Sequence, residues 1–388
     1  MKTIVFAHPN FLDSTSMPLF AKQIADGLRK HGDSVEIWQP KALIRRLPCP
    51  NIFKKWLGYI DQYLVFPLTA CLRAYFLPAD TLFIFSDQAL GPWVPIFAKR
   101  PHVIHCHDLL ALRSSLGEFS QNHLSLTGRL YQAWIRRGFG RGRRFICVSH
   151  RSKEELLRFL PTDSTATVDV VHNGLNYPFS PMDPNYAIEV LSGTGSQIPI
   201  SGFLLHVGGN QWYKNRAGVI AIYAAYVMRH HSPLPLVMIG AAPNAAMLDA
   251  KKQIPSHGCV EFVVRPSVEV LHAAYSLASA LIFPSVAEGF GWPIIEAMAC
   301  GCPVLTTDDA PMTEAGGNAA TYLPLSHGNQ RDWAIKCASI LANLLARSPS
   351  ERERVRSAGL SHAAGFSEDQ TIDRYLKIYS RIIVEATA

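Results

Sequence analysis

The chain has 388 residues, more than one hydrophobic core usually serves, so we expect two domains. Apolar residues make up 48% and charged residues 17% of the sequence, which excludes an intrinsically disordered protein. The net charge of +7 comes from the first half, because residues 1–182 contain 22 Lys and Arg against 13 Asp and Glu, whereas residues 183–388 contain 15 against 17.

The first half alternates short apolar strands with helical patterns. A helix is expected over Pro18–His31, ended by Gly32, and another over Arg151–Leu160, capped by Ser149. The expected strands are Thr3–Ala7, Ser34–Trp38, Thr81–Phe85, His102–Cys106, Arg144–Val148 and Val168–His172. Nearly continuous apolar strands separated by helices predict a parallel sheet covered on both faces.

After a segment rich in Pro, Ser and Gly, the alternation restarts. The expected strands of the second half are Phe203–Val207, Leu236–Gly240, Val260–Val264, Leu281–Ser285 and Pro303–Thr307, and the expected helices are Arg216–Met228, Ser267–Ser279, Pro293–Cys300, Asp332–Arg347 and Ser367–Ala386. We therefore predict an α/β protein with two doubly wound, Rossmann-like domains whose strand ends face a cleft. The predicted boundaries are 1–180, a linker at 181–200, 201–365, and a final helix at 366–388 that closes against either domain.

The most specific stretch runs from Phe283 to Pro303. Within it a strand ends at Ser285, and Gly289 and Gly291 permit unusual backbone angles. Pro293 then starts a helix that Gly301 ends. Two carboxylates eight residues apart, Glu288 on the loop and Glu296 in the helix, can accept hydrogen bonds from sugar hydroxyls in the cleft. Taken alone, Glu288 is equally compatible with an ordinary solvated loop residue, and Glu296 with an acidic residue that merely favours the start of a helix.

This stretch resembles the E-x7-E region of the retaining glycosyltransferases of family 4, which have the two-domain GT-B fold. The resemblance covers about residues 100–325. Other segments that carry it are Leu204 to Gly209 with Lys214-Asn215, Glu261-Phe262-Val263, Leu271 to Leu281, Pro311 to Glu314, and, more weakly, His107-Asp108, Val148-Ser149 and His172-Asn173-Gly174.

The resemblance implies roles for individual residues. Glu296 would bind the ribose of a nucleotide sugar, Glu288 would bind the transferred sugar, and Lys214 would neutralise the diphosphate, as the charge developing on a leaving nucleotide also requires. His107, placed at the carboxyl end of a strand, would contact the sugar or the transition state. The remaining donor-binding candidates are Gly208, Gly209, Arg265 near the base, Gly289, Phe290, Gly291 and Trp292.

Two departures from the family pattern stand out. Many relatives carry an arginine five residues before the loop lysine, where this chain has Gly209. A second contact to the diphosphate would therefore come from Arg216 or from another cation, or it would be absent. The first loop, His8 to Ser16, lacks the paired glycines common in the family. We interpret His8 and His172 as structural histidines.

The sequence predicts a hexosyltransferase that moves a sugar from a UDP- or GDP-sugar to a glycan or lipid-linked saccharide, with retention and without a metal or cofactor. The main alternative is a GT-B scaffold subunit that binds sugar nucleotides without catalysis; an epimerase and a phosphorylase are less well matched. No recognition helix, RNA-stacking motif or zinc module favours nucleic acid.

We expect a cytoplasmic protein. The N-terminus is typical of a strand rather than a signal peptide, no charge-free run fits a membrane span, and the eight cysteines lack the spacing of a zinc site or disulfide framework. Basic clusters interleaved with apolar residues predict contact with an anionic membrane surface, with a solvated basic face as the alternative: Arg45-Arg46, Lys54-Lys55-Trp56-Leu57, Arg136-Arg137 and Arg141 to Arg144.

Overall fold

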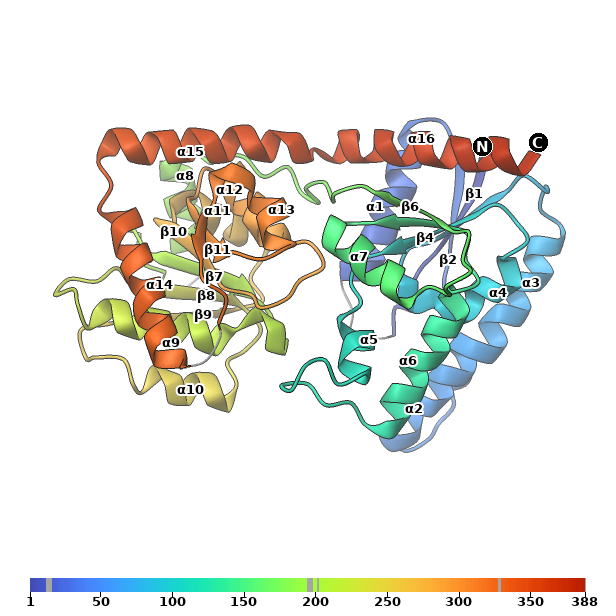
Figure 1. Cartoon of the computed structure of the whole chain (residues 1–388), viewed down its shortest axis with the longest axis horizontal. Coiled ribbons are helices and arrows are strands. Elements are labelled where there is room, and N and C mark those ends of the chain that lie inside the picture. The colour runs from blue at the N-terminus through green and yellow to red at the C-terminus, as the bar shows by residue number, and fades with distance from the viewer. Residues whose placement is uncertain (12–15, 194–197, 201, 327–328, 388) are drawn as a thin grey trace. The chain divides into compact units, whose positions relative to one another are not determined.

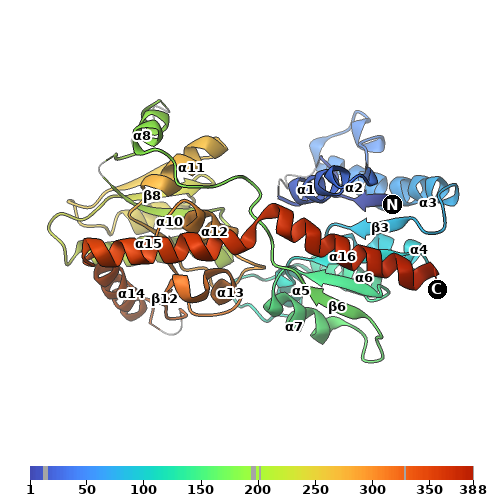
Figure 2. The ribbon, with the colours of Figure 1, turned by 90° about the horizontal axis from the view of Figure 1, so that it is seen from above.

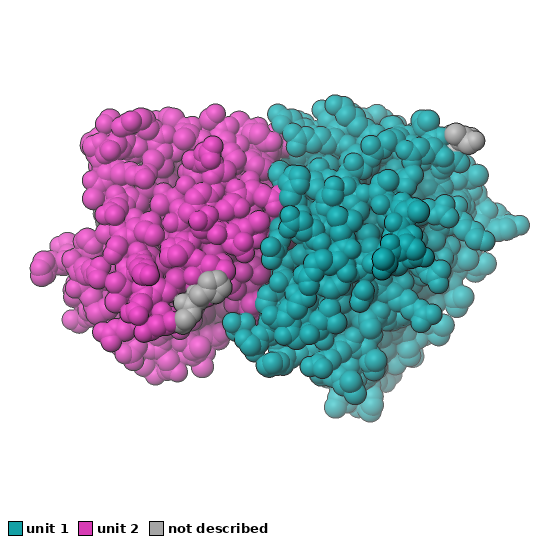
Figure 3. Space-filling view, viewed as in Figure 1, with its two compact units in different colours: residues 1–176, 368–388 teal, residues 177–367 magenta. Residues whose placement is uncertain are grey.

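The computed structural model describes residues 1–11, 16–193, 198–200, 202–326 and 329–387, and the chain forms two compact units (Figures 1 and 3). Unit 1 comprises Met1–Asn176 together with Glu368–Ala388, and unit 2 comprises Tyr177–Ser367. The chain therefore leaves unit 1 once and returns to it. Residues Leu12 to Thr15 of the first loop lie outside the described residues.

Unit 1 is built on a parallel sheet in the order β2-β1-β3-β4-β5-β6. Its described strands are β1 (Lys2–Phe6), β2 (Ser34–Trp38), β3 (Leu82–Phe85), β4 (His102–Cys106), β5 (Arg144–Cys147) and β6 (Thr167–Val170). Every residue of β3 and β4 is buried, as expected of central strands covered on both faces. The strand order changes direction between β1 and β3, which is where doubly wound sheets bind ligands.

Helices cover both faces of this sheet. They are α1 (Ser16–Lys30), α2 (Asn51–Ile60), α3 (Phe66–Tyr75), α4 (Val94–Phe97), α5 (Leu110–Ser115), α6 (Leu126–Phe139), α7 (His150–Phe159) and α16 (Glu368–Thr387). Helix α16, which can be followed in Figure 2, packs against α1 and places Tyr375 and Tyr379 in the interior. The Tyr379 hydroxyl lies 2.7 Å from His105 Nε2 in β4.

Unit 2 has its own parallel sheet, in the order β12-β11-β10-β7-β8-β9. Its described strands are β7 (Leu204–Gly208), β8 (Leu236–Gly240), β9 (Val260–Val264), β10 (Ala280–Phe283), β11 (Val304–Thr307) and β12 (Thr321–Leu323). The order changes direction between β7 and β10, so the loops that follow these two strands meet at the carboxyl edge of the sheet.

The helices of unit 2 pack on both sides of that sheet. They are α8 (Pro184–Ser192), α9 (Arg216–Val227), α10 (Ala245–Lys251), α11 (Val268–Leu277), α12 (Trp292–Ala299), α13 (Met312–Gly316), α14 (Gln330–Leu345) and α15 (Pro349–Ala363). The core between α9, α14 and the sheet is aliphatic and aromatic, with Tyr223 and Leu341 fully buried. The two parallel sheets confirm the predicted fold class.

The segment expected to be an irregular linker at 181–200 contains a helix. Asp183 accepts hydrogen bonds from the amides of Asn185 and Tyr186, and Pro184 stands at the first helical position, where its missing N–H costs nothing. Helix α8 then packs against α11 within unit 2. Pro184 and Gly193, two of the residues that suggested a linker, mark the two ends of this helix. Residues 194–197 lie outside the described residues.

None of the helices among the described residues combines the length and the apolar character that crossing a bilayer requires.

Candidate functional site

The loop between β10 and α12 carries the two predicted carboxylates. Gly291, the residue before α12, has φ 110°, a left-handed conformation that favours glycine, and Pro293 stands in the first turn of the helix. Gly291 is the N-cap residue and has no side chain with which to cap α12. The helix therefore begins at the carboxyl edge of the sheet with its positive pole directed out of the sheet.

A second loop, between β7 and α9, is fastened to the first. The Val286 amide donates to the Tyr213 carbonyl at 2.8 Å, and Asn215 Nδ2 donates to the Pro284 carbonyl at 3.2 Å. Asn215 has a left-handed conformation, with φ 50°, which ends the short helical turn Trp212–Lys214. These bonds join loops that lie about 70 residues apart in the sequence.

Lys214 and Glu288 meet where the two loops are joined. Lys214 Nζ lies 2.7 Å from Glu288 Oε1, and the two side chains are 15% and 8% exposed. Partial burial strengthens an ion pair relative to one on the surface, because less water screens it. The structure thus brings together the cation and one of the two carboxylates that the sequence singled out.

Glu296 lies on α12 and is almost fully buried. Burial raises the pKa of Glu296 to about 7, while the hydrogen bond that Tyr275 donates to Oε2 at 2.8 Å and the charge of Lys214 oppose this rise. A carboxyl group with this pKa changes charge near neutral pH. The hydrogen bond of Tyr275 to Glu296 was not predicted, because the sequence of an apolar helix does not show which residue a tyrosine in it will contact.

Gly208 and Gly240 are opposite each other on β7 and β8. Gly240 has φ 141°, and a Cβ there would lie 2.0 Å from the Gly208 carbonyl oxygen. The backbones therefore approach so closely that Gly240 cannot carry a side chain without moving the end of β7. Gly209 follows immediately, beside the side chain of Gln211.

The other donor-binding candidates also lie at this edge of the sheet. Arg265 follows β9 with φ 46°, and its amide donates to the Gly240 carbonyl at 2.9 Å. Gly289 is half-buried and Trp292 begins α12. Phe290 is buried, with its ring centroid 5.8 Å from that of Phe366, so its side chain is part of the packing of unit 2.

Arg216 points into the protein. The residue is 4% exposed, and its Nη1 donates to the Asn210 side chain and, at 2.9 Å, to the Ala241 carbonyl. Burial lowers the pKa of this guanidinium group. The contacts formed by Nη1 hold the loops after β7 and β8 in place. Nε and Nη2 are buried without a hydrogen-bond partner among the described residues, so Arg216 as a second diphosphate contact stays a prediction.

His107 lies in unit 1, at the carboxyl end of β4. Its ring Nε2 lies 3.0 Å from the Ser86 carbonyl, its amide donates to Gln88 Oε1 at 2.9 Å, and its carbonyl accepts from Ser152 Oγ at 2.8 Å. Burial lowers the pKa of His107, although the nearby Asp87 charge opposes this. The histidine is therefore a neutral ring in a fixed orientation.

A polar cluster surrounds His107 at the edge where β1, β3 and β4 end. His8 Nε2 lies 2.8 Å from Asp87 Oδ2, and the Gln88 side chain bonds the Asp108 carbonyl. Neither Asp87 nor Gln88 was predicted from the sequence. The available signal was their position directly after a buried strand, at the point where the strand order changes direction.

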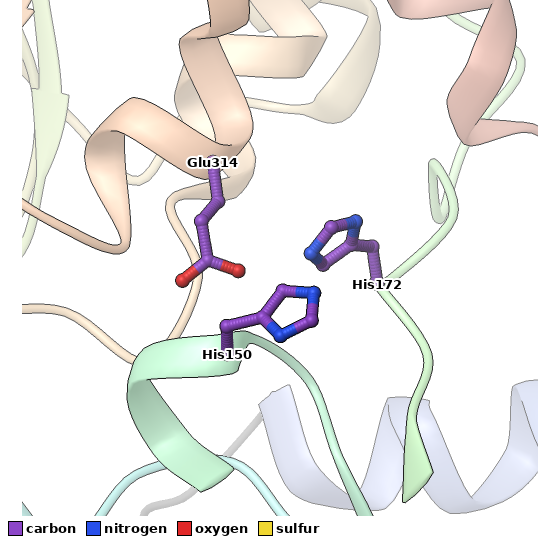
Figure 4. Close-up of side chains that lie close together, drawn as sticks. All are labelled: His150, His172 and Glu314. Atoms are coloured by element: carbon purple, nitrogen blue, oxygen red, sulfur yellow. The ribbon is translucent and has the colours of Figure 1, made fainter. Parts of the chain in front are cut away.

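Two further histidines of unit 1 lie near each other (Figure 4). His150 begins α7 and His172 follows β6, and their ring centroids are 5.9 Å apart. The His172 carbonyl accepts from Thr371 of α16 at 3.3 Å. Two histidines provide fewer ligands than a protein zinc site requires. Glu314, also drawn in Figure 4, belongs to unit 2.

Comparison with known proteins matches each unit to a family. Residues 19–177 match the model described as Glycosyltransferase Family 4, and residues 201–360 match the model described as Glycosyl transferases group 1. The O-antigen chain mannosyltransferase B of Escherichia coli is 27% identical over 238 residues, which are 59% of this chain and 59% of that protein. Eight curated relatives are matched over 30% to 59% of their own length.

Solved structures show the same fold at low sequence identity. A sucrose-phosphate synthase from Thermosynechococcus elongatus superposes with a TM-score of 0.72 at 16% identity, covering 99% of this chain and 100% of that one. The Anabaena protein HepE, solved in complex with UDP and glucose, gives a TM-score of 0.66 at 16% identity over 98% of this chain and 100% of that one. Residues 19–177 therefore belong to Glycosyltransferase Family 4 and residues 201–360 to Glycosyl transferases group 1, and the solved structures show that the chain has the GT-B fold.

Proposed function

We propose that the protein transfers a hexose from a UDP- or GDP-sugar to a glycan or lipid-linked saccharide, with retention of anomeric configuration. The single observation that carries the proposal is the ion pair of Lys214 and Glu288, formed between two loops at the carboxyl edge of the second sheet. The structural neighbour HepE was solved with UDP and glucose, which supports a nucleotide-sugar donor.

Each group of the site has a proposed role. The ribose hydroxyls donate to Glu296, the hydroxyls of the transferred sugar donate to Glu288, and the amides from Gly289 to Trp292 are directed to the same sugar. Lys214 contacts the diphosphate, and such a charge-assisted hydrogen bond contributes about 1.5–3 kcal/mol. Because Lys214 Nζ already lies 2.7 Å from Glu288, donor binding inserts a second anionic group beside this ammonium.

The reaction we propose occurs on one face of the sugar. The bond from the anomeric carbon to the phosphate oxygen breaks, and its electron pair stays on the nucleoside diphosphate. The acceptor oxygen forms the new bond on the same face, and its proton passes to the departing phosphate oxygen. Lys214 and the N-terminus of α12 stabilise the charge on that leaving group. No step uses a carboxylate as a covalent nucleophile.

His107 is proposed to help bind the sugar or acceptor from unit 1. Its Nε2 hydrogen is used by the Ser86 carbonyl, which leaves Nδ1 as the acceptor of the ring. In the proposed role this nitrogen accepts a hydrogen bond from a sugar hydroxyl. The polar cluster of His8, Asp87 and Gln88 keeps the ring in place.

A panel of UDP-, GDP- and ADP-sugars, scored by the shift in unfolding temperature, tests the donor. We expect one base to stabilise the protein by several degrees, as specific ligand binding does. If none of the nucleotides stabilises the protein, the proposed donor class is wrong. Activity is proposed to survive excess EDTA, and its loss with rescue by a divalent ion would overturn the metal-independent mechanism.

The rival function is a scaffold that binds sugar nucleotides without catalysis. Turnover of the nucleotide sugar separates the two proposals, because Glu288→Ala reduces turnover in an enzyme and leaves a scaffold equally inactive. The intact ion pair of Glu288 with Lys214 favours the enzyme.

We propose a cytoplasmic location with unit 1 at an anionic membrane surface. Unit 1 contains 25 Lys and Arg against 17 Asp and Glu, whereas unit 2 contains 12 against 13. Flotation with anionic and neutral vesicles at low salt tests this charge-based attraction, and equal flotation with both kinds of vesicle would refute it.

A further inference from the structure

A long helical segment of unit 1 exposes an apolar face. Residues 51–75 run without a break through α2, the π-helical turn Asp61–Val65 and α3. The described part of the chain has 26 large apolar side chains classed as exposed, and nine of them are in this segment and the residue that follows it: Ile52, Phe53, Trp56, Ile60, Leu64, Leu68, Leu72, Tyr75 and Phe76. We refer to these nine residues as the apolar stripe.

The π-helical turn reduces the rotation of the stripe around the helix axis. Members of the stripe recur every four residues from Ile52 to Phe76, and in a regular α-helix each such step drifts about 40° around the axis. A π turn takes up extra residues and so reverses part of this drift. It also accommodates Pro67, whose ring would clash with the preceding turn of a regular helix.

The opposite face of the segment is fixed to the core of unit 1. Phe66, Ala70 and Ala74 are buried, and the Phe66 ring lies 4.6 Å from Trp93. Buried Asp61 accepts hydrogen bonds from the amides of residues 43–45. The stripe is therefore the outer face of a well-anchored helix.

Helix α6, labelled near α2 in Figure 1, adds further exposed apolar side chains. Its aromatic rings contact α2 and the π-helical turn, with centroids 6.1 Å apart for Tyr59 and Tyr131 and 4.7 Å apart for Tyr63 and Trp134. Its own exposed apolar residues, Leu126, Leu130 and Trp134, are again spaced by four. Two neighbouring helices thus present many exposed apolar side chains, whereas exposed apolar residues on a soluble protein are usually scattered singly.

The charges around the apolar stripe favour an anionic partner. Within residues 51–76, all of which the structure describes, the acidic side chain is Asp61, which is buried, while Lys54 and Lys55 are at least partly exposed. Arg73 is also exposed, but it is paired with Glu36 at 2.9 Å. A hollow of about 500 Å³ beside Trp134 is lined by Lys99, Arg137, Arg141 and Arg143. Trp, Phe and Leu on an exposed helix face, with basic residues nearby, are typical of helices that lie in the interface of a membrane.

We propose that the apolar stripe and the exposed apolar face of α6 insert into the acyl region of an anionic lipid bilayer. This inference deepens the proposed function, because it names the surface of unit 1 by which a glycosyltransferase would reach a lipid-linked acceptor. The basic side chains contact the lipid headgroups, while the apolar side chains enter below them. Binding then has two separable components, one sensitive to salt and the other to apolar area.

The test uses the full-length chain and vesicles of phosphatidylglycerol and phosphatidylcholine. In the stripe variant, Ile60→Gln, Leu64→Gln and Leu68→Gln remove three exposed apolar side chains. The matched control makes the same three changes at exposed positions elsewhere, Leu157→Gln, Met228→Gln and Leu248→Gln. We expect the partition coefficient of the stripe variant to fall about tenfold or more and that of the control to stay within about twofold of the parent.

Two further measurements complete the experiment. Lys54→Gln with Lys55→Gln is expected to remove much of the salt dependence while leaving apolar binding. Brominated acyl chains are expected to quench Trp56 fluorescence, measured as the difference between the parent and Trp56→Phe. Quenching that is identical in these two proteins, or a parent chain that does not bind vesicles, overturns the proposal.

The alternative to a membrane is that a second copy of the chain covers the apolar stripe. If light scattering shows a parent dimer that the stripe variant dissociates, with no vesicle binding, the stripe is a dimer interface and the membrane proposal is wrong. Donor-induced thermal stabilisation is measured in every variant. Its absence in the parent overturns the proposed function, whereas its presence together with absent vesicle binding overturns the membrane inference alone.

Discussion

The two units use the same kind of sheet but differ in one connection. In unit 2 the second and third strands, β8 and β9, both lie on the same side of β7, and helix α10 joins them. In unit 1 the second strand, β2, lies on one side of β1 and the third, β3, on the other, and residues 51–75 form the helical crossing. The chain between the second and third strands therefore differs: in unit 2 it leads through α10 to the edge strand β9, and in unit 1 it forms the helical segment 51–75 with its apolar outer face.

The difference extends to the polar groups. Unit 2 holds charged groups close together and away from water, as in the pair of Lys214 with Glu288 and the buried Glu296. At the strand ends of unit 1, the neutral ring of His107 is hydrogen-bonded to Ser86 and lies near one buried carboxylate, Asp87. The excess of basic residues in unit 1 lies elsewhere. Within the proposed function, this contrast suggests that unit 2 handles the charged donor and unit 1 the acceptor.

The largest effect is expected at the ion pair. Glu288→Gln and Lys214→Met should each lower kcat/KM for sugar transfer by about a hundredfold or more, because each removes a charge that acts on the donor. The double variant should lose less than the product of the two, since the groups contact each other. Steady-state kinetics of the three variants measure this coupling. Near-parental rates in the single variants would contradict the assignment of the donor site to unit 2.

A backbone substitution tests how far the donor site depends on its strands. Gly240→Ala should destabilise unit 2 by about 3 kcal/mol, because the new Cβ would meet the Gly208 carbonyl in a left-handed conformation. Gly365→Ala is the control, since no atom lies within 4 Å of a Cβ built there. Chemical denaturation measures both. Equal stability of the two variants would show that the close approach of β7 and β8 is unimportant.

The buried carboxyl group predicts a pH dependence that belongs to unit 2. Because the pKa of Glu296 is raised to about 7 from 4.5 in the unfolded chain, the native state binds more protons between these values. The free energy of unfolding should therefore fall as pH rises from 4.5 to 7, by on the order of 3 kcal/mol, and be independent of this group above pH 7.

Glu296→Gln provides the comparison for this titration, because the amide does not ionise and its size is similar. The difference in unfolding free energy between this variant and the parent should grow across the same pH range. Denaturant titrations at pH 5 and pH 8 measure it. A difference that is constant with pH would mean that Glu296 has an ordinary pKa and is less desolvated than the structure indicates.

The smallest effect is expected in unit 1. Tyr379→Phe removes the hydroxyl that lies 2.7 Å from His105 Nε2 and should cost about 1 kcal/mol of stability, the usual contribution of one hydrogen bond. Donor binding, measured by thermal shift, should not change, since α16 belongs to unit 1. A loss of donor affinity in Tyr379→Phe would break the assignment of separate tasks to the two units.

The sequence predicted most strands because β-branched and aromatic runs between turn residues have few other structures available. The bounds of β4, β8 and β9 agree with the expected ranges. Helix α8 was missed, because the segment around it is rich in Pro, Ser and Gly like a linker, whereas the helix packs against α11. Strand β12 has three residues, too few for a periodic pattern.

The candidate site was predictable to a smaller extent. Glu288, Glu296 and Lys214 could be found because loop glycines and a proline mark the turns that carry them. Their partners could not: the Tyr275 hydroxyl reaches Glu296 across 21 residues, and the inward direction of Arg216 depends on the loop after β8. The apolar stripe was also missed, because a sequence pattern does not show which face of an apolar helix is covered.

Unit 1 is interrupted in the sequence by the whole of unit 2, and this has a consequence for biosynthesis. Tyr375 and Tyr379 of α16 complete its interior beside β4. Unit 2 can close its core once residue 367 has left the ribosome, but the nascent unit 1 must wait for residues 368–387 with its apolar surface incompletely covered. The part of the chain made first is therefore the last to finish folding.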